Sequence, residues 1–362
     1  MIETVGQPTV VVALSGGVDS AVAAARLVQQ GHEVIGVTLR LLDDSGEHTV
    51  PSPEAAQRAR ATAQQLDIPF RIIDARDAFK REVVDYFVSE YASGRTPNPC
   101  VRCNRFIRFG LLMDHARALG ASTLATGHYA QVREADEEYQ LLRGRDRTKD
   151  QSYFLHMLDQ RQLAHTIFPL GRLTKEHVRA SASRLDLPVV GQAESQDVCF
   201  LVKGDYRQFL RQQVPQAMRP GPIRDTSGRI LGEHRGLGAY TIGQRKGLGI
   251  SAPHPLYVIA IDSWENAIVV GAAAELGRSN CSVESLHFVS GEIPSHPFRA
   301  EAQIRYRARP TPVSVHPIPG ARATVHFSET QRDITPGQSL VLYDGNVVLG
   351  GGIICESRLP VL

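Results

Sequence analysis

The sequence of 362 residues lacks any long hydrophobic run. A helix that spans a bilayer needs about 20 consecutive apolar residues, and no stretch approaches that length. The first apolar stretch, Thr9–Leu14, has no basic segment before it and leads directly into a glycine turn. These features predict a first strand and not a secretion signal. We therefore expect a cytoplasmic protein that makes no contact with a membrane.

The chain also has little net charge. Its formal charge is +2, so the chain as a whole attracts nucleic acid only weakly. The distribution is uneven, since residues 203–250 hold nine Lys/Arg against three acids, and residues 95–108 hold four arginines and no acid. Such stretches suit a phosphate backbone. For each stretch alone, solvated surface charge is the simpler explanation.

Cysteine is scarce, and its number is odd. The five cysteines stand at positions 100, 103, 199, 281 and 355, which argues against a disulfide framework in a cytoplasmic chain. Cys100 and Cys103 have the C-x-x-C spacing of redox pairs and of half zinc sites. A four-ligand zinc site needs a second close Cys/His pair, and none is evident. We expect Cys281 and Cys355 to be ordinary small buried residues.

Strand and helix patterns alternate in the first half of the chain. The runs 9–14, 33–40 and 70–74 predict buried strands, with a short fourth strand near 122–127. Helices are expected over 19–30, from Pro53, over 79–91 and near 109–119, with an extended, proline-stiffened loop before the C-x-x-C pair. This order predicts an α/β domain with a Rossmann-like parallel sheet.

Glycine and proline become frequent after about residue 205, and short alternating runs such as 256–262, 338–344 and 346–354 replace the helical patterns. These runs predict strands joined by turns. We expect three domains: an α/β domain over 1–204, a central β-rich domain over 205–280 and a C-terminal β-rich domain over 281–362.

A glycine-rich string, Ser15-Gly16-Gly17-Val18-Asp19-Ser20, lies between the first strand and the first helix. Its glycines let backbone N–H groups approach an anion, and the helix end adds donors and a positive dipole. Neither GxxxxGK[ST] nor GxGxxG is present, so neither a motor NTPase nor a dinucleotide enzyme is favoured. Two glycines alone would indicate only a turn.

The complete string SGGVDS resembles the PP-loop of the ATP pyrophosphatases. The resemblance implies that ATP is split between its α and β phosphates, and that Asp19 helps to hold Mg²⁺. It also implies that the residues lining ATP are Ala13, Leu14, Ser15, Gly16, Gly17, Val18, Asp19, Ser20, Leu39 and Gly127.

Two further strings make the resemblance specific. They are the PNPCxxCN run at 97–104 and the SQDVCF run at 195–200. Together with SGGVDS they resemble the tRNA-specific 2-thiouridylases, which thiolate uridine 34. Matching strings continue over nearly the whole chain, at 125–130, 146–155, 234–249, 304–307 and 335–345. The family implies that the central domain binds tRNA and that the third domain is a β-barrel.

The resemblance also implies a mechanism. Adenylation of uracil O2 makes AMP the leaving group, and a persulfide on Cys199 then delivers sulfur to C2. Cys103 is the partner thiol, and it forms a disulfide with Cys199 that a reductant reopens. We expect low-pKa thiols, with thiolates stabilised by Arg102 and Arg105.

The partners are implied in the same way. The tRNAs are those with Glu, Gln and Lys anticodons, and the sulfur comes from a cysteine desulfurase or a relay protein. We expect a monomer. The residues expected to contact tRNA are His128, Lys149, Asp150, Gln151, Arg305, Tyr306 and Gln338. The alternative for His128 is a purely structural role. An arginine next to a tyrosine, as at Arg305–Tyr306, is suited to contact a phosphate and to stack on a base.

One position departs from the family pattern, because many members have Asp where this chain has Cys100. The chain thus offers three thiols, Cys100, Cys103 and Cys199, which suffice to hold a [4Fe-4S] cluster with one open iron. The persulfide and cluster mechanisms both stay open. Three other functions remain as alternatives: a PP-loop amidotransferase or synthetase, an RNA-binding module with a degenerate nucleotide site, and a 4-thiouridine type thiolase.

Overall fold

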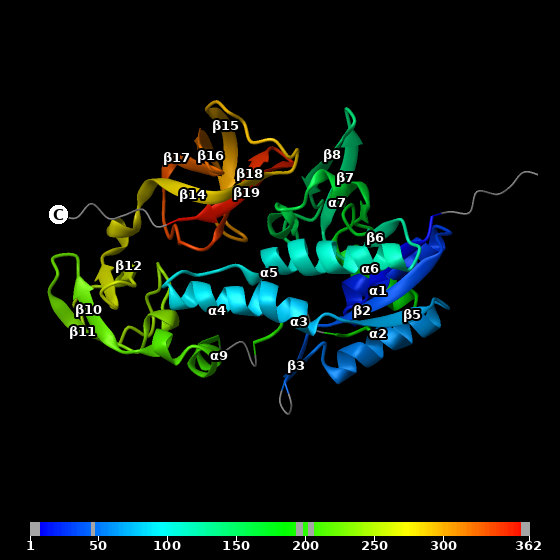
Figure 1. Ribbon diagram of the computed structural model, residues 1–362, viewed down its shortest axis with the longest axis horizontal. Helices are drawn as coiled ribbons and strands as arrows, with labels where there is room; N and C mark the ends of the chain where they lie inside the picture. Colours follow the sequence, from blue (N-terminus) through cyan, green and yellow to red (C-terminus); the bar gives the residue numbers. More distant parts are fainter. Residues whose placement is uncertain (1–7, 45–47, 193–197, 202–205, 356–362) are drawn as a thin grey trace, which may run out of the picture.

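The computed structural model describes residues 8–44, 48–192, 198–201 and 206–355 (Figure 1). Its first part is built on a parallel sheet with the strand order β5-β2-β1-β6-β9. The strands are β1 Val10–Ala13, β2 Val34–Arg40, β5 Phe70–Asp74, β6 Thr123–Ala125 and β9 Thr166–Ile167. This confirms the predicted Rossmann-like α/β sheet. Strand β9 was missed because two residues leave no readable pattern.

Helices cover both faces of this sheet, and β1 shows why. Val10 and Val12 point into a core shared with α1 (Val18–Gln29), α2 (Pro53–Gln65) and α8 (Lys175–Arg184). Val11 points into a second core on the opposite face, shared with α6 (Leu112–Ala118). A strand alternates its side chains between faces, so an unbroken valine run serves two cores at once.

Two long helices carry wide, π-helical central turns. One runs through α3 (Arg76–Phe79), η1 (Lys80–Val84) and α4 (Asp85–Ala92), and the other through α5 (Pro99–Arg102), η2 (Cys103–Leu111) and α6. The second helix was expected to begin near Phe109, but it begins at Pro99. Proline is well suited to the first helical position. Cys100 and Cys103 therefore lie on helical turns.

The second half of the chain forms two β structures. The central sheet has the order β11-β10-β13-β12, and the C-terminal sheet closes into a six-stranded antiparallel barrel through the pairing of β14 with β19. Figure 1 shows the central sheet at the end of the molecule toward which α4 points, and the barrel above α4. The strands are β10 Gly221–Asp225, β11 Ile230–His234, β12 Tyr257–Asp262, β13 Ala267–Gly271, β14 Arg278–Phe288, β15 Phe298–Gln303, β16 Thr311–Ile318, β17 Arg322–Gln331, β18 Ser339–Asp344 and β19 Val347–Ile354.

A hairpin from the first part of the chain is joined to the barrel. Strands β7 (Ala130–Ala135) and β8 (Glu138–Arg143) extend the barrel sheet through pairing of β8 with β19. Beneath this junction, Phe109 and Tyr153 share one core with Val341 and Tyr343 of β18. The barrel is thus packed firmly against the α/β part.

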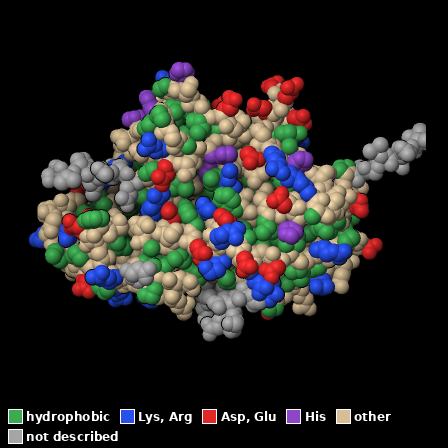
Figure 2. Space-filling model, viewed as in Figure 1, with side chains coloured by type: hydrophobic (Ala, Val, Ile, Leu, Met, Phe, Trp, Pro, Cys, Tyr) green, Lys and Arg blue, Asp and Glu red, His purple; other side chains and the backbone are tan. Residues whose placement is uncertain are grey.

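The remaining elements are short. They are β3 Leu42–Asp44, β4 His48–Val50, η3 Ser152–Leu155, α7 Gln160–Ala164, α9 Tyr206–Gln213, η5 Pro215–Met218, η6 Leu237–Ala239 and η7 Ala273–Leu276. Figure 2 shows charges of both signs interspersed over the visible face. Among the helices of the described ranges, none is long and apolar enough to cross a membrane.

Candidate active site

The glycine-rich turn leaves the amino end of α1 open to a ligand. Gly17 precedes the helix, and no side chain caps it there. Ser20 Oγ accepts from the Ser15 N–H at 3.1 Å and donates to the Gly17 carbonyl at 3.0 Å, which fixes the turn. Gly16 has a φ of 76°, and a Cβ there would lie 2.0 Å from the Ala55 carbonyl oxygen. Only glycine fits, and the first-turn N–H groups form a site suited to an anion.

Asp19 lies in the first turn of α1 and binds a lysine distant in sequence. Lys175 Nζ donates to both Asp19 carboxylate oxygens, at 2.7 and 2.8 Å, and the Tyr129 hydroxyl donates to Oδ1 at 2.8 Å. Lys175 is buried, at 8% exposure. Carboxylate oxygens are suitable ligands for Mg²⁺, but in this structure the ammonium group occupies both.

Two other residues were expected to line ATP, Gly127 and Leu39. Gly127 lies against the glycine-rich turn, and Leu39 lies on the strand next to β1. A Cβ on Gly127 would come within 2.8 Å of the Asp19 carbonyl carbon and of Ser20 N, so the backbone at 127 lies directly against the PP-loop. Leu39 is near the carboxyl end of β2, paired with Ile73 of β5. Ligands of open α/β sheets bind at this edge.

The three candidate thiols lie close together although Cys199 is distant in sequence. All three are free in the structure. Desolvation first and the neighbouring thiols second raise the pKa of Cys100 to about 11 and that of Cys199 to about 12, although both residues keep part of their surface exposed to solvent. The pKa of Cys103 is also raised, mainly by burial. The direction of these pKa shifts is opposite to that expected for low-pKa thiols.

Arg108 is the cation that opposes this shift, and the expectation for Arg102 and Arg105 was wrong. Arg108 lowers the pKa of each of the three thiols and hydrogen-bonds Cys103. Arg102 instead binds Glu82 at 3.2 Å, and Arg105 donates to the Met157 carbonyl. The physical reason is the π-helical turn: its hydrogen bonds run over five residues, which brings Arg108 one turn above Cys103.

His128 connects the thiol side to the PP-loop side. It is buried against the rings of Phe109 and Phe168, with centroids 6.0 Å away in each case, and its Nδ1 lies 2.7 Å from Thr126 Oγ1. Burial, assisted by the charge of Arg108, lowers its pKa to about 3. His128 is thus neutral and structural here. Its expected contact with tRNA stays a prediction.

The segment before Cys100 is held by the barrel. Thr96 N donates to the Pro336 carbonyl at 2.8 Å, and Gln338 Nε2 donates to the Thr96 carbonyl at 2.9 Å. A Cβ on Gly337 would lie 2.9 Å from three Thr96 backbone atoms. Arg95 also binds Glu284 at the start of the barrel, at 2.8 Å. The barrel therefore fixes where the thiol-bearing helix begins.

Comparison with known proteins is decisive at this point. Residues 8–203, 207–272 and 278–354 match the models of a tRNA methyl transferase HUP domain, a tRNA methyl transferase PRC-barrel domain and an aminomethyltransferase beta-barrel domain. A tRNA-specific 2-thiouridylase MnmA of Moorella thermoacetica is 50% identical, over 95% of this chain and 98% of its own. The same protein of Roseiflexus sp. is 48% identical, over 96% and 99%.

The chain belongs to the tRNA-specific 2-thiouridylase family. This confirms the family indicated by the motifs, and with it the enzyme class, tRNA-uridine 2-sulfurtransferase. Among solved structures, a U34-tRNA thiolase NcsA from Methanococcus maripaludis with its [4Fe-4S] cluster is 18% identical, with a TM-score of 0.35 over 58% of this chain and 68% of that one.

The other residues expected to contact tRNA lie against other parts of the protein. The Asp150 carboxylate accepts from Gly144 N at 2.9 Å and Ser152 N at 3.1 Å, and Gln151 Oε1 accepts from Tyr129 N at 3.0 Å. Arg305 binds Asp333 at 3.3 Å, and the Tyr306 ring lies 4.5 Å from Phe154. Lys149 lines a cavity. Contact with tRNA stays a prediction for each.

Sequence reasoning missed Lys175, Tyr129 and Arg108. Tyr129 follows the predicted His128 directly, so the motif already contained it. Arg108 lies in the basic stretch 95–108, but only the helical geometry separates it from Arg102 and Arg105. Lys175 follows Thr174, whose side chain caps α8, and nothing in the local sequence shows that it meets Asp19.

Proposed function

We propose that this chain adenylates O2 of uridine 34 in tRNA with ATP and then replaces the activated oxygen with sulfur. The observation that supports this most directly is that the PP-loop and the three thiols belong to the same α/β part of the chain. Gly127 lies against the PP-loop, and the charge of Arg108 acts both on the adjacent His128 and on the three thiols. An ATP-dependent ligase that uses ammonia has no need for the thiols.

The first half-reaction takes place at the PP-loop. Uracil O2 forms a bond to the α phosphorus, the bond from that phosphorus to the bridging oxygen breaks, and pyrophosphate leaves with the electron pair. The N3 proton leaves to solvent in this step and returns to N3 when the thiocarbonyl forms. The first-turn N–H groups of α1 stabilise negative charge on the phosphates. Gly16 and Gly127 let backbone approach this region where a side chain would collide. Mg²⁺, held by Asp19, would neutralise the departing pyrophosphate.

The second half-reaction takes place at the thiols. The terminal sulfur of a Cys199 persulfide attacks C2, and AMP leaves with the C2–O2 bonding pair. Cys103 thiolate then attacks Cys199 Sγ, breaking the S–S bond, so that the thiocarbonyl stays on uracil and a Cys103–Cys199 disulfide forms. A dithiol reductant returns two electrons. Because burial raises the pKa of Cys103, Arg108 must stabilise its thiolate.

Within the described residues, no group of three His, Cys, Asp or Glu side chains is arranged to hold a single metal ion. Cys100, Cys103 and Cys199 nevertheless lie near one another, and the [4Fe-4S] alternative stays a prediction. Cys100 lies beside Cys103 and Cys199, and we assign it no step. In the persulfide account it is a neighbour that raises the pKa of Cys199.

The remaining expectations belong to the same proposal. Uridine 34 leaves the anticodon stack to reach the site, in tRNAs with Glu, Gln and Lys anticodons. The domains 1–204, 205–280 and 281–362 act as catalytic, tRNA-binding and barrel units of a cytoplasmic monomer. A cysteine desulfurase or relay protein supplies sulfur.

The test is thiolation of a tRNA transcript by the full chain with ATP, a persulfide donor and reductant. The 2-thiouridine product is identified by mass spectrometry of the nucleosides, and a transcript with C34 is the substrate control. Cys199→Ser should abolish the product, whereas Cys355→Ser, in the barrel, should retain it. Thiolation by Cys199→Ser at the wild-type rate, or no thiolation by the wild type, would refute the proposal.

A further inference from the structure

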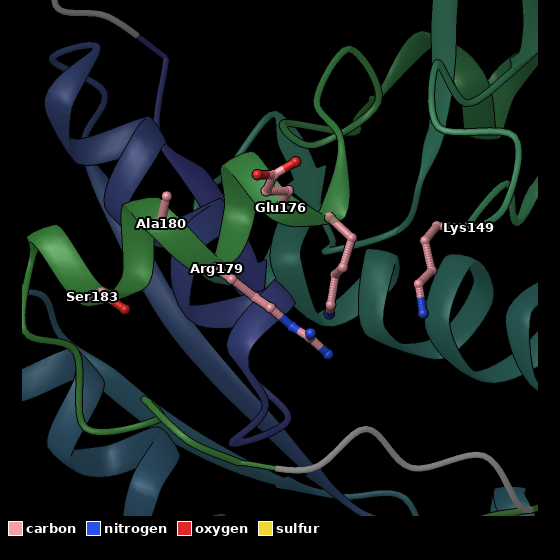
Figure 3. Close-up of a pocket in the computed structure, with 6 residues that line it drawn as sticks. Lys149, Glu176, Arg179, Ala180 and Ser183 are labelled. Carbon is pink, nitrogen blue, oxygen red and sulfur yellow. The ribbon is translucent and has the colours of Figure 1, made fainter.

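A cavity of about 510 Å³ opens beside the PP-loop (Figure 3). This volume lies within the range of small-molecule sites. Its lining carries three cations and one carboxylate, together with two small residues: Lys149, Lys175, Glu176, Arg179, Ala180 and Ser183. Figure 3 shows the side chains of Arg179 and Lys149 extending toward the same space, while Glu176 points to the other side of α8. The cavity therefore presents mainly positive charge.

Asp146 ties the turn that carries Lys149 to the start of α8, where Lys175 lies. Asp146 Oδ2 accepts from Lys175 N at 2.9 Å, Oδ1 accepts from Thr148 N at 3.0 Å, and the Asp146 carbonyl accepts from Lys149 N at 3.1 Å. Burial alone would raise the pKa of Asp146, but these hydrogen bonds lower it overall. The 146–149 turn and the start of α8 thus form one unit, which fixes the backbone at Lys149 relative to the backbone at Lys175.

Lys175 connects this cavity to the PP-loop. Its Nζ is bound to both oxygens of Asp19, in the first turn of α1. A buried ammonium needs such a partner. A divalent cation on Asp19 would take the same oxygens and displace the ammonium group, which then requires another source of negative charge. The cavity that Lys175 lines has room for such a charge.

We propose that Lys175, Arg179 and Lys149 bind the pyrophosphate portion of ATP, and that Lys175 moves from Asp19 to these phosphates when the nucleotide enters with its divalent cation. Without nucleotide, the Lys175 ammonium group lies where the divalent cation would bind to Asp19. With nucleotide and cation bound, Lys175 contacts the phosphates instead. This rests on the proposed cleavage of ATP to AMP and pyrophosphate. It adds three residues from outside the PP-loop to the binding of the leaving group.

Binding of magnesium pyrophosphate and of AMP to the full chain, measured separately by calorimetry without tRNA, tests the site. Arg179→Ala should weaken pyrophosphate binding about tenfold, as expected for loss of a charge-assisted hydrogen bond, and leave AMP binding unchanged. Lys149→Ala should act in the same way. The matched control is Arg184→Ala, an exposed arginine of the same helix outside the cavity, which should bind both ligands as the wild type does.

Two outcomes would overturn the assignment. One is wild-type pyrophosphate affinity in both Arg179→Ala and Lys149→Ala. The other is an unchanged pyrophosphate affinity with weaker tRNA binding, which would make these cations part of the RNA surface. Because the assay needs neither tRNA nor sulfur, it separates failure of this site from failure of thiolation.

The exchange of Lys175 has its own test, with Mn²⁺ as the probe and electron paramagnetic resonance as the readout. Without nucleotide, Lys175→Met should bind one Mn²⁺ that the wild type does not, because Asp19 is released. The double variant Lys175→Met/Asp19→Asn should lose that ion. No gain in Lys175→Met shown to be folded by circular dichroism, or a gain that survives in the double variant, would contradict the exchange.

Discussion

The side-chain amide of Gln338 donates to the Thr96 carbonyl oxygen at 2.9 Å, joining residues 242 positions apart. The hydrogen bond from Thr96 N to Pro336 completes a two-way connection between a barrel loop and the segment before Pro99. Because the thiol-bearing helix begins at Pro99, the barrel sets the position of Cys100 and Cys103. A domain that looks peripheral to the chemistry therefore contributes to its geometry.

Replacing Gln338 with Ala should lower kcat for thiolation and leave the KM for tRNA nearly unchanged. Loss of one hydrogen bond costs about 1 kcal/mol, which corresponds to about a fivefold lower rate if the cost falls on the reactive geometry. Gln331→Ala, in the same barrel, is the control, because the side-chain amide of Gln331 donates to the nearby Glu329 carbonyl. A raised KM with kcat unchanged would instead assign Gln338 to tRNA contact.

The close approach of Gly337 to Thr96 gives a prediction about stability. Gly337 has a φ of 89°, and a Cβ would lie 2.9 Å from Thr96 backbone atoms, whereas Gly345 has a φ of 54° with open space around it. Gly345→Ala should cost only the left-handed penalty of about 1 kcal/mol. Gly337→Ala should cost about 2 kcal/mol more, because backbone must shift. Equal midpoints in urea unfolding of the two variants would contradict this close packing.

Two buried neutral histidines predict loss of stability in mild acid. Burial lowers the pKa of His128 to about 3 and that of His156 to about 4, while in the unfolded chain each titrates near 6.5. Between these values the unfolded state binds more protons, so the free energy of unfolding falls as pH falls. At pH 5 each histidine should account for about 2 kcal/mol of the loss relative to pH 7.

Urea unfolding at pH 7 and pH 5 measures this effect. His156→Asn should show a smaller difference between the two pH values than the wild type, whatever its stability at pH 7. His115→Asn, at an exposed position, should show the full difference. A pH dependence that is the same in all three proteins would mean that His156 is not buried in the neutral form.

Arg108 should control the reactivity of the thiols. It lowers the pKa of Cys100, Cys103 and Cys199, so Arg108→Met should raise all three. At pH 9 alkylation of Cys199 by iodoacetamide should become about threefold slower, since less thiolate is present. Peptide mass spectrometry reports the rate. Arg117→Met, on α6 beside Asp114, should leave the alkylation rate of Cys199 unchanged. Equal slowing in both variants would show that Arg108 does not control the reactivity of Cys199.

The sequence predicted the parts of the site that are contiguous in it. Valine runs indicated the central strands, and SGGVDS indicated the PP-loop, because both signals are local. It did not predict that Lys175 meets Asp19 across 156 positions, nor that the hairpin of β7 and β8 extends the barrel. Such pairings depend on tertiary packing. The sequence also pointed to Arg102 and Arg105 where the structure has Arg108 beside the thiols. The reason is a π-helical turn, which the ordinary α-helical period does not predict.

The central claim is that sulfur passes from Cys199 to uridine 34 with Cys103 as the resolving thiol. The most direct measurement is a single turnover of iron-free protein, charged with persulfide and given ATP and a U34 transcript without reductant. The account predicts one 2-thiouridine and one Cys103–Cys199 disulfide per active site by mass spectrometry, and undiminished product from Cys100→Ser. Thiolation that appears only with bound iron, and that Cys100→Ser abolishes together with the iron, would contradict it.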